Sequence, residues 1–180
     1  MINLLVLKDH SAGKKGLAIA LGAVIPDLII LLLYFWHLLI GTPEDIIWSV
    51  EYYRPGWQAI IDGFNSIPLL LIAGLVCWKY HHPILLMLFA SMLLHCLGDL
   101  PVHHEDAHRH FFPFLEWRFL SPVSYWNPAH YGNLFSLFEA SAVVASTVYL
   151  YTKYRHLKNW VIATLVVYIL YWIYVAIYWL

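Results

Sequence analysis

Residues 95–110 read His-Cys-Leu-Gly-Asp-Leu-Pro-Val-His-His-Glu-Asp-Ala-His-Arg-His. This stretch begins inside an apolar segment, ends before an aromatic loop, and holds five of the chain's eleven His residues. Neutral imidazole and carboxylate are the usual protein ligands of zinc and related metal ions. We therefore predict a metal site at this stretch and expect the remaining helices to be arranged around it.

The composition is that of a membrane protein. Of the 180 residues, 62% are hydrophobic and 12% are charged, against about 45–50% and about 25% in soluble domains. The nine Trp and thirteen Tyr residues suit side chains at the level of lipid headgroups. With a net charge of -1 and no cluster of basic residues, a nucleic-acid partner is excluded. We expect an integral membrane protein in contact with membrane lipids, and the oligomeric state is left open.

Apolar segments divide the chain into predicted membrane spans. The first is long enough to cross a hydrocarbon layer of ~30 Å at ~1.5 Å per residue. The five predicted spans are about 17–40, 57–80, 84–100, 131–151 and 160–180. Residues 101–130 form the longest polar segment, a His-rich and aromatic loop packed at the interface. The expected fold is all-α: a polytopic bundle of about five transmembrane helices in a single membrane domain over residues 1–180.

Lys and Arg residues indicate how this bundle is oriented. Seven of the ten fall on one side of the predicted membrane, which the positive-inside rule assigns to the cytoplasm. We therefore expect a cytoplasmic N-terminus, with the C-terminus and the His-rich loop on the outer face. The membrane expected is the cytoplasmic (inner) membrane of a bacterium.

Polar residues on four predicted spans fall at one depth. Counted from the cytoplasmic ends of the predicted spans at a rise of ~1.5 Å per residue, these polar residues lie in a band less than ~10 Å tall near the bilayer middle. These residues are Asp27, Asn65, His95, Asp99 and Glu139. Carboxylates and imidazoles at that depth are costly unless they are paired, bind metal or face water. The band therefore predicts a shared site.

His95 and Asp99 are the strongest ligand candidates in this band. Their spacing of four residues puts both side chains on one face of a helix, where they can hold one ion, and His103 extends that face by a turn. Two or three further ligands are expected in the loop, and the remaining loop side chains are expected to support the ligands or transfer protons. The loop candidates are His103, His104, Asp106, His108 and His110.

Two more His residues are candidate ligands outside the cluster. His130 opens the fourth span, where it suits a ligand or a general base at the mouth of the site. His10 can be a ligand if the N-terminal segment folds under the bundle; otherwise it is a solvated terminal His.

Catalytic roles are predicted for four other side chains. Asp27, Asp106 and Glu139 are candidate general bases, and Arg109 is a candidate for holding a phosphate, because its planar fork matches phosphate oxygens. Structural alternatives remain open. Asp27 can cap a kinked half-helix after Pro26, Asn65 can join two helices, Glu139 can be a protonated core carboxyl, and Arg109 can be an ordinary interfacial residue.

In these motifs the chain resembles the YdjM-like family of membrane-bound metal-dependent hydrolases. Members carry an early His, a Pro-Asp motif in the first long helix, a His-Ser pair opening the next, and a later H-x-x-x-D motif. Here His10, Pro26-Asp27, Asn65-Ser66 and His95-x-x-x-Asp99 fall in the same order, over about residues 10–130. The resemblance implies a metal-dependent hydrolase, with phosphoesters of lipid-like molecules as the substrate class.

One part of the family pattern is replaced. Members usually carry an H-R-G-x-T-H-S run, and this chain has Ile60 and Asn65 at its two His positions. If those His residues bind metal in relatives, the site here must be rebuilt, with residues 103–110 as the replacement. Otherwise catalysis has been lost.

The leading hypothesis is a membrane-embedded hydrolase, with zinc as the expected metal, that cleaves a phosphoester or other ester of a lipid-like substrate by a metal-activated water. His95, Asp99 and one or two of the loop His residues hold the ion. Arg109 or the metal takes up the developing negative charge. Two alternatives are a non-catalytic membrane protein with a structural metal site and a transporter that handles metal ions or protons. Five spans without an inverted repeat argue against common transporters.

Overall fold

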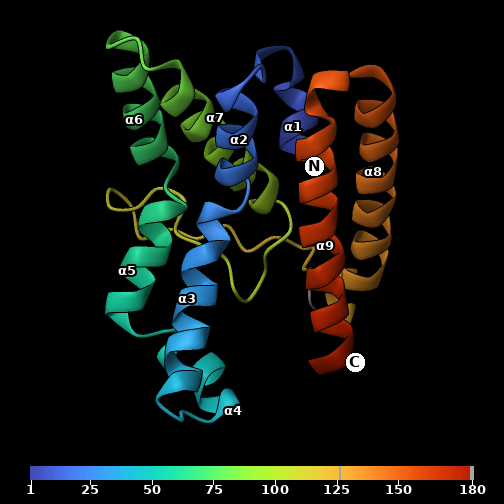
Figure 1. Cartoon of the computed structure of the whole chain (residues 1–180). Helices are drawn as coiled ribbons and strands as arrows, with labels where there is room; N and C mark the ends of the chain where they lie inside the picture. The colour runs from blue at the N-terminus through green and yellow to red at the C-terminus, as the bar shows by residue number, and fades with distance from the viewer. Residues whose placement is uncertain (126, 179–180) are drawn as a thin grey trace.

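A computed structural model of the chain describes residues 1–125 and 127–178, and in that part all regular structure is helical (Figure 1). The all-α prediction is confirmed. The helices are α1 (Ile2–Val6), α2 (Lys14–Gly22), α3 (Ile25–Leu39), α4 (Glu44–Ile46), α5 (Pro55–Phe64), α6 (Ile67–Lys79), α7 (Pro83–Asp99), α8 (Gly132–Lys153) and α9 (Lys158–Tyr178). Short helical turns lie at η1 (Lys8–His10), η2 (Ile47–Glu51), η3 (Pro128–His130) and η4 (Arg155–Leu157). The last two residues of the predicted span 160–180 lie outside the described residues.

Two of the predicted spans are each broken into two helices. The axes of α2 and α3 differ by 56°, and those of α5 and α6 by 45°. Proline lies in the first turn of both α3 and α6, and it restricts the residue before it and cannot continue a preceding helix. By length and composition, α8 can cross a membrane on its own. If the bent pairs α2–α3 and α5–α6 are each counted as one membrane span, the described residues contain up to three candidate spans.

The breaks and the end of α7 lie at one level of the bundle. In Figure 1, α2, α6 and α7 lie on one side of this level, and α3, α4 and α5 lie on the other. Helices α8 and α9 pack side by side along one flank, and the loop that follows α7 runs through the middle of the molecule at the level of the breaks (Figure 1). The His-rich part of this loop, with Ala107, His108 and His110 buried, therefore lies inside the bundle and not at the interface that the sequence predicted, whereas the part around Leu115 and Trp117 is exposed.

Helix α7 forms the centre of the upper half by packing on both α2 and α6. Its contact with α2 is close because Gly22 faces it: a Cβ at this position would lie 2.4 Å from the Leu88 carbonyl oxygen. Beside this contact the Ser91 hydroxyl donates a hydrogen bond to the Ile19 carbonyl at 2.6 Å, and the Asn3 amide donates to the Ser91 carbonyl at 2.8 Å. Small residues and interhelical hydrogen bonds are the means by which helices pack in membranes.

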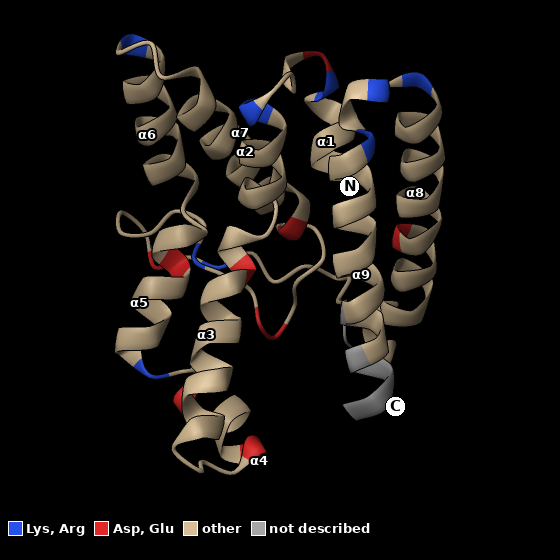
Figure 2. Ribbon diagram, in the orientation of Figure 1, with Lys and Arg blue, Asp and Glu red and all other residues tan. Residues whose placement is uncertain are grey.

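The outer surface of the helices is apolar. Large side chains such as Trp36 and Leu39 on α3, Trp78 on α6 and Leu134 on α8 are more than half exposed. Extended apolar surfaces of this kind mark membrane or protein contacts. Lys and Arg residues gather at the end of the bundle that holds the α6–α7 and α8–α9 turns, as Figure 2 shows. Which end faces the cytoplasm stays a prediction.

The contact at Gly22 gives a first test. Gly22→Ala should destabilise the protein by roughly 1–3 kcal/mol, the usual cost of overpacking, because the added methyl meets the α7 backbone. Gly63→Ala is the matched control, since no other described residue lies within 4 Å of a Cβ there. Thermal unfolding in detergent, followed by size-exclusion chromatography, measures both. A Gly22→Ala variant that melts with or above the wild type would contradict this packing.

Candidate metal centre

Asp27, His95 and Asp99 meet at the level of the helix breaks. The Nε2 atom of His95 lies 2.7 Å from Oδ2 of Asp99 and 3.4 Å from Oδ1 of Asp27. Asp27 is in the first turn of α3, directly after Pro26, while His95 and Asp99 lie one turn apart at the end of α7. Three of the five residues predicted at one depth are thus in direct contact.

The three side chains fit a divalent metal ion. Each offers one ligand atom, and these atoms lie within 4.8 Å of one another. Bonds of ~2.0–2.1 Å to a tetrahedral ion separate neighbouring ligand atoms by about 3.3 Å, which falls between the two measured distances. His95 Nε2 is also buried, and it makes no hydrogen bond of acceptable geometry with any described residue. A buried nitrogen aimed at two carboxylates without such a bond suits a metal ligand.

The surroundings of this group favour a cation and leave one side open. Asp99 is the last residue of α7, where the helix dipole is negative and a carboxylate needs a positive partner. The Asp27 side chain is 56% exposed, whereas those of His95 and Asp99 are only 12% and 13% exposed. Access to the group is therefore from the Asp27 side, as a catalytic site with an open position requires.

His103 and Asp106 form a hydrogen-bonded pair in the loop. Nδ1 of His103 lies 2.8 Å from Oδ2 of Asp106. Burial is the largest single effect and lowers the pKa of His103, but the hydrogen bond and charge of Asp106 together with the charges of Asp99 and Asp27 outweigh it, so the net pKa lies above the ordinary value. These carboxylates therefore favour the protonated imidazole. The predicted base Asp106 serves in the structure to orient this imidazole.

His108 and His110 are buried in the same loop. Their ring centroids are 5.8 Å apart, and the ring of His108 lies 5.4 Å from that of His103. Burial, followed by the charge of His103, lowers the pKa of His108 to about 4, and burial also lowers the pKa of His110. Both rings are therefore neutral at pH 7.

Hydrogen bonds from the loop close the break between α5 and α6. The Ile67 amide donates to the His110 carbonyl at 2.9 Å, and the Ser66 hydroxyl donates to the Phe112 carbonyl at 2.5 Å. Nδ1 of His110 lies 3.0 Å from the Asn65 carbonyl. Backbone groups freed by a helix break must be paired when they are buried. The predicted ligand His110 thus has a structural partner at the break.

Asn65 connects α5 and α7. Its amide nitrogen donates to the Ile61 carbonyl at 3.0 Å, and its oxygen is 3.9 Å from Sγ of Cys96. Among the alternatives predicted for Asn65, these contacts correspond to the one that joins two helices.

A buried ion pair holds the loop against α5. Asp62 is fully buried, and it accepts hydrogen bonds from the Arg109 backbone amide at 3.0 Å and from Nε of Arg109 at 2.5 Å. Arg109 also pairs with Glu116. The fork predicted to hold a phosphate is therefore engaged by two carboxylates. Asp62 was not among the predicted site residues, although a carboxylate in an apolar segment signals a need for a partner.

Glu139 lies on the α8 side of the loop. Its side chain hydrogen-bonds Tyr125, whose ring packs edge-on against Phe135 of α8 at 4.9 Å between centroids. Burial, together with the nearby Glu139 charge, raises the pKa of the Tyr125 hydroxyl. Tyr125 therefore connects Glu139 to the loop.

The remaining predicted ligands do not join the Asp27 group. His10 is exposed on η1, at the opposite end of α2 from the break. His104 and His130 gather with Glu105 in a second group of possible metal ligands. Glu105 was not predicted as a site residue, and its position beside His130 depends on the tertiary path of the loop.

No family model, curated protein or solved structure matches this chain.

The Asp62–Arg109 pair gives a second test. Asp62→Asn should loosen the loop, because Arg109 then keeps only its exposed partner Glu116 and loses charge-assisted hydrogen bonds to a buried carboxylate, at a cost of roughly 1.5–3 kcal/mol. Asp9→Asn is the matched control, since it removes one partner of an exposed pair with Lys8, and such pairs contribute roughly 0–1 kcal/mol. Limited proteolysis within residues 101–130 should be faster in Asp62→Asn and unchanged in Asp9→Asn. Equal rates in Asp62→Asn and wild type would show that the pair does not hold the loop.

Proposed function

We propose that this protein is a membrane-embedded, metal-dependent hydrolase, with zinc held by Asp27, His95 and Asp99. The observation that carries the proposal is the buried Nε2 of His95, which lies between two carboxylate oxygens without a well-formed hydrogen bond. One imidazole and two carboxylates are a donor set that zinc accepts. Asp27, predicted as a general base, here contributes one oxygen to the ligand set.

We further propose that the chain crosses the membrane five times. In this topology the bent pairs α2–α3 and α5–α6 are single broken passes, and the other three are α7 together with the loop that follows it, α8, and α9. Support comes from the apolar outer surface and from the concentration of Lys and Arg at one end of the bundle (Figure 2). Broken helices within a membrane are tolerated where protein covers the freed backbone, which is the role of the loop at Ser66 and Ile67.

The chemistry divides between the metal and the loop. A zinc ion held by Asp27, His95 and Asp99 would supply a Lewis acid that lowers the pKa of water toward ~7. Asp27 is the exposed carboxylate of the group, so its second oxygen would be free to hold a proton. His103 holds a proton because Asp106 raises its pKa, and it donates this proton to the leaving-group oxygen. Glu139 positions Tyr125 and takes no proton in this scheme.

An open apolar pocket on the surface favours a lipid-like substrate. It has a volume of about 430 Å³ and lies along the start of α8, where Tyr131, Leu134 and Phe138 are exposed. Its lining residues are Val123, Tyr131, Leu134, Phe135 and Phe138. Phe135 also contacts Tyr125, so the pocket adjoins the loop that carries the imidazoles. An ester with an acyl or isoprenoid chain in this pocket is the proposed substrate class.

The resemblance to the YdjM-like family supports the same class of reaction. The Pro-Asp and H-x-x-x-D motifs supply all three proposed ligands. Asn65, at a family His position, hydrogen-bonds Ile61 and lies beside Cys96, so the proposed ligand set does not need a His there.

Metal content tests the ligand set. Wild-type protein should contain stoichiometric metal, and His95→Gln and Asp99→Asn should each lose one equivalent and reduce hydrolysis of a micellar phosphoester probe by roughly 10²-fold or more. His10→Ala is the control and should keep both, because His10 lies outside the group. Elemental analysis of purified protein is the measurement.

A wild type without stoichiometric zinc, iron or manganese would reject the proposal. The same three side chains would then hold a proton, which is the arrangement expected of a non-catalytic or proton-handling protein. The full wild-type metal stoichiometry in both His95→Gln and Asp99→Asn would place the ion elsewhere.

The role of His103 gives a pH test. The reaction needs the protonated imidazole, so activity should fall as pH rises through its raised pKa. Asp106→Asn removes the main group that raises this pKa, and the alkaline limb of the kcat profile should move to lower pH. His103→Asn should lower kcat by roughly 10²–10⁴-fold while the metal is retained. An alkaline limb unmoved in Asp106→Asn would exclude His103 as the acid.

A further inference from the structure

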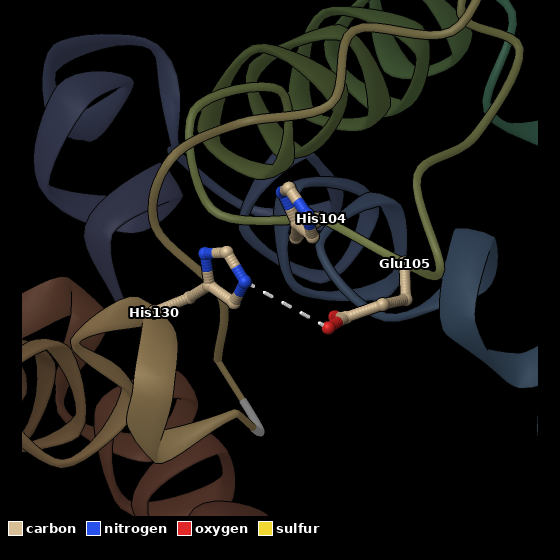
Figure 3. Close-up of side chains that lie close together, drawn as sticks. All are labelled: His104, Glu105 and His130. Carbon is tan, nitrogen blue, oxygen red and sulfur yellow. Dashed lines mark ion pairs between the residues drawn. The ribbon is translucent and has the colours of Figure 1, made fainter.

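His104, Glu105 and His130 form a second cluster on the exposed side of the loop. Figure 3 shows the three side chains close together, with the His130 imidazole turned toward the Glu105 carboxylate and the His104 ring beside it. The rings of His104 and His130 are stacked, with centroids 3.9 Å apart and 23° between their planes. Nε2 of His130 lies 4.0 Å from Oε1 of Glu105, and one ligand atom of each residue lies within 4.8 Å of the others.

Backbone carbonyls orient both imidazoles. Nδ1 of His104 lies 2.6 Å from the Ser121 carbonyl oxygen, and Nδ1 of His130 lies 3.3 Å from that of Pro122. Because a carbonyl only accepts, each Nδ1 carries the hydrogen, which leaves Nε2 as the ring atom available to a metal ion. Imidazoles that ligate metals are usually held in this way, and the hydrogen bond raises their basicity.

The carboxylate of Glu105 is also oriented. The Asn127 amide donates to Oε1 of Glu105 at 2.6 Å. A backbone hydrogen bond and then this amide lower the pKa of Glu105 below its ordinary value. Glu105 is therefore ionised at neutral pH and carries a full negative charge beside the two rings.

The cluster places three acceptors together. One ligand atom of each side chain lies within 4.8 Å of the others, and a rotation of the stacked His104 and His130 rings is needed for both Nε2 atoms to face one ion. A cation shared by the three groups is favoured by the charge of the Glu105 carboxylate. We propose that His104, Glu105 and His130 bind a divalent transition-metal ion, zinc in the first place, at a second site that shares no residue with the Asp27 group. Two imidazoles and one carboxylate leave a fourth position for water.

This ion joins two ends of the loop. His104 and Glu105 follow His103 in the chain, whereas His130 lies in η3, immediately before α8. A metal bond between them connects the segment that carries His103 and Asp106 to the start of α8. Since the unfolded chain lacks the preformed site, binding stabilises the folded loop.

Zinc stoichiometry after equilibrium dialysis tests the second site. Wild type should bind one equivalent more than Glu105→Gln and one more than His130→Ala. Glu105→Gln keeps an oxygen that can accept from Asn127, so the loop should stay folded even if His130→Ala disturbs it. His82→Ala, an exposed His at the α6–α7 turn, is the matched control and should bind as wild type does. Equal binding by wild type and both cluster variants would overturn the proposal.

The two sites can be separated in the same experiment. Asp99→Asn removes one equivalent if the Asp27 group binds metal, whatever happens at the second site. Should wild type bind a single equivalent that Glu105→Gln loses and Asp99→Asn keeps, the second site stands and the proposed hydrolase fails. Added zinc should also slow proteolysis between residues 104 and 130 in wild type several-fold, and it should not do so in Glu105→Gln. Equal protection of both proteins would contradict a metal bond at Glu105.

Discussion

The structure depends on pairing the backbone groups that two broken helices leave free. Burying such groups without a partner costs several kcal/mol each in an apolar surrounding. At the break between α5 and α6, the loop supplies these partners through His110, whose carbonyl accepts from the Ile67 amide and whose Nδ1 lies beside the Asn65 carbonyl. The loop therefore has to run inside the bundle, and this requirement places its imidazoles beside the ends of the helices.

The same breaks explain where the carboxylates lie. Asp27 is in the first turn of α3, where the positive end of the helix dipole stabilises it. Asp99 is at the end of α7, where the dipole disfavours it. His95, one turn earlier in α7, bridges the two. Asp62, near the end of α5, takes Arg109 as its partner. Asp62 is thus paired with a cationic side chain. Asp27 and Asp99 lie beside the His95 nitrogen, and a metal ion could bind to all three.

Much of this arrangement could be predicted from the sequence. The spans that became α7 and α8 were placed within one or two residues because they are continuous apolar runs, and the i, i+4 spacing correctly paired His95 with Asp99. The position of Asp27 along its predicted span placed it at the same depth as His95 and Asp99. The break at Ser66 was missed because hydropathy averages over residues 57–80. Ser66 followed by Pro68 was the available signal, a helix cap and a first-turn proline.

The path of the loop could not be predicted from spacing. Residues 101–125 lack a regular period, and the partners of their side chains come from distant segments, as with Arg109 and Asp62. The grouping of Glu105 with His130, 25 positions away, has the same cause. Sequence spacing therefore identified the group of Asp27, His95 and Asp99 on the helices. The contacts of the loop side chains depend on the tertiary fold and could not be predicted in this way.

Amide hydrogen exchange measured residue by residue tests the interior position of the loop most directly. The amides of Ser121 and Tyr125 donate to the carbonyls of His103 and Val102, both at 3.0 Å, outside any helix. The Ile67 amide, at the start of α6, has its partner in the loop. All three should be protected to the same degree as amides inside α7. Exchange of the three at the rate of an exposed segment would contradict a loop folded into the bundle.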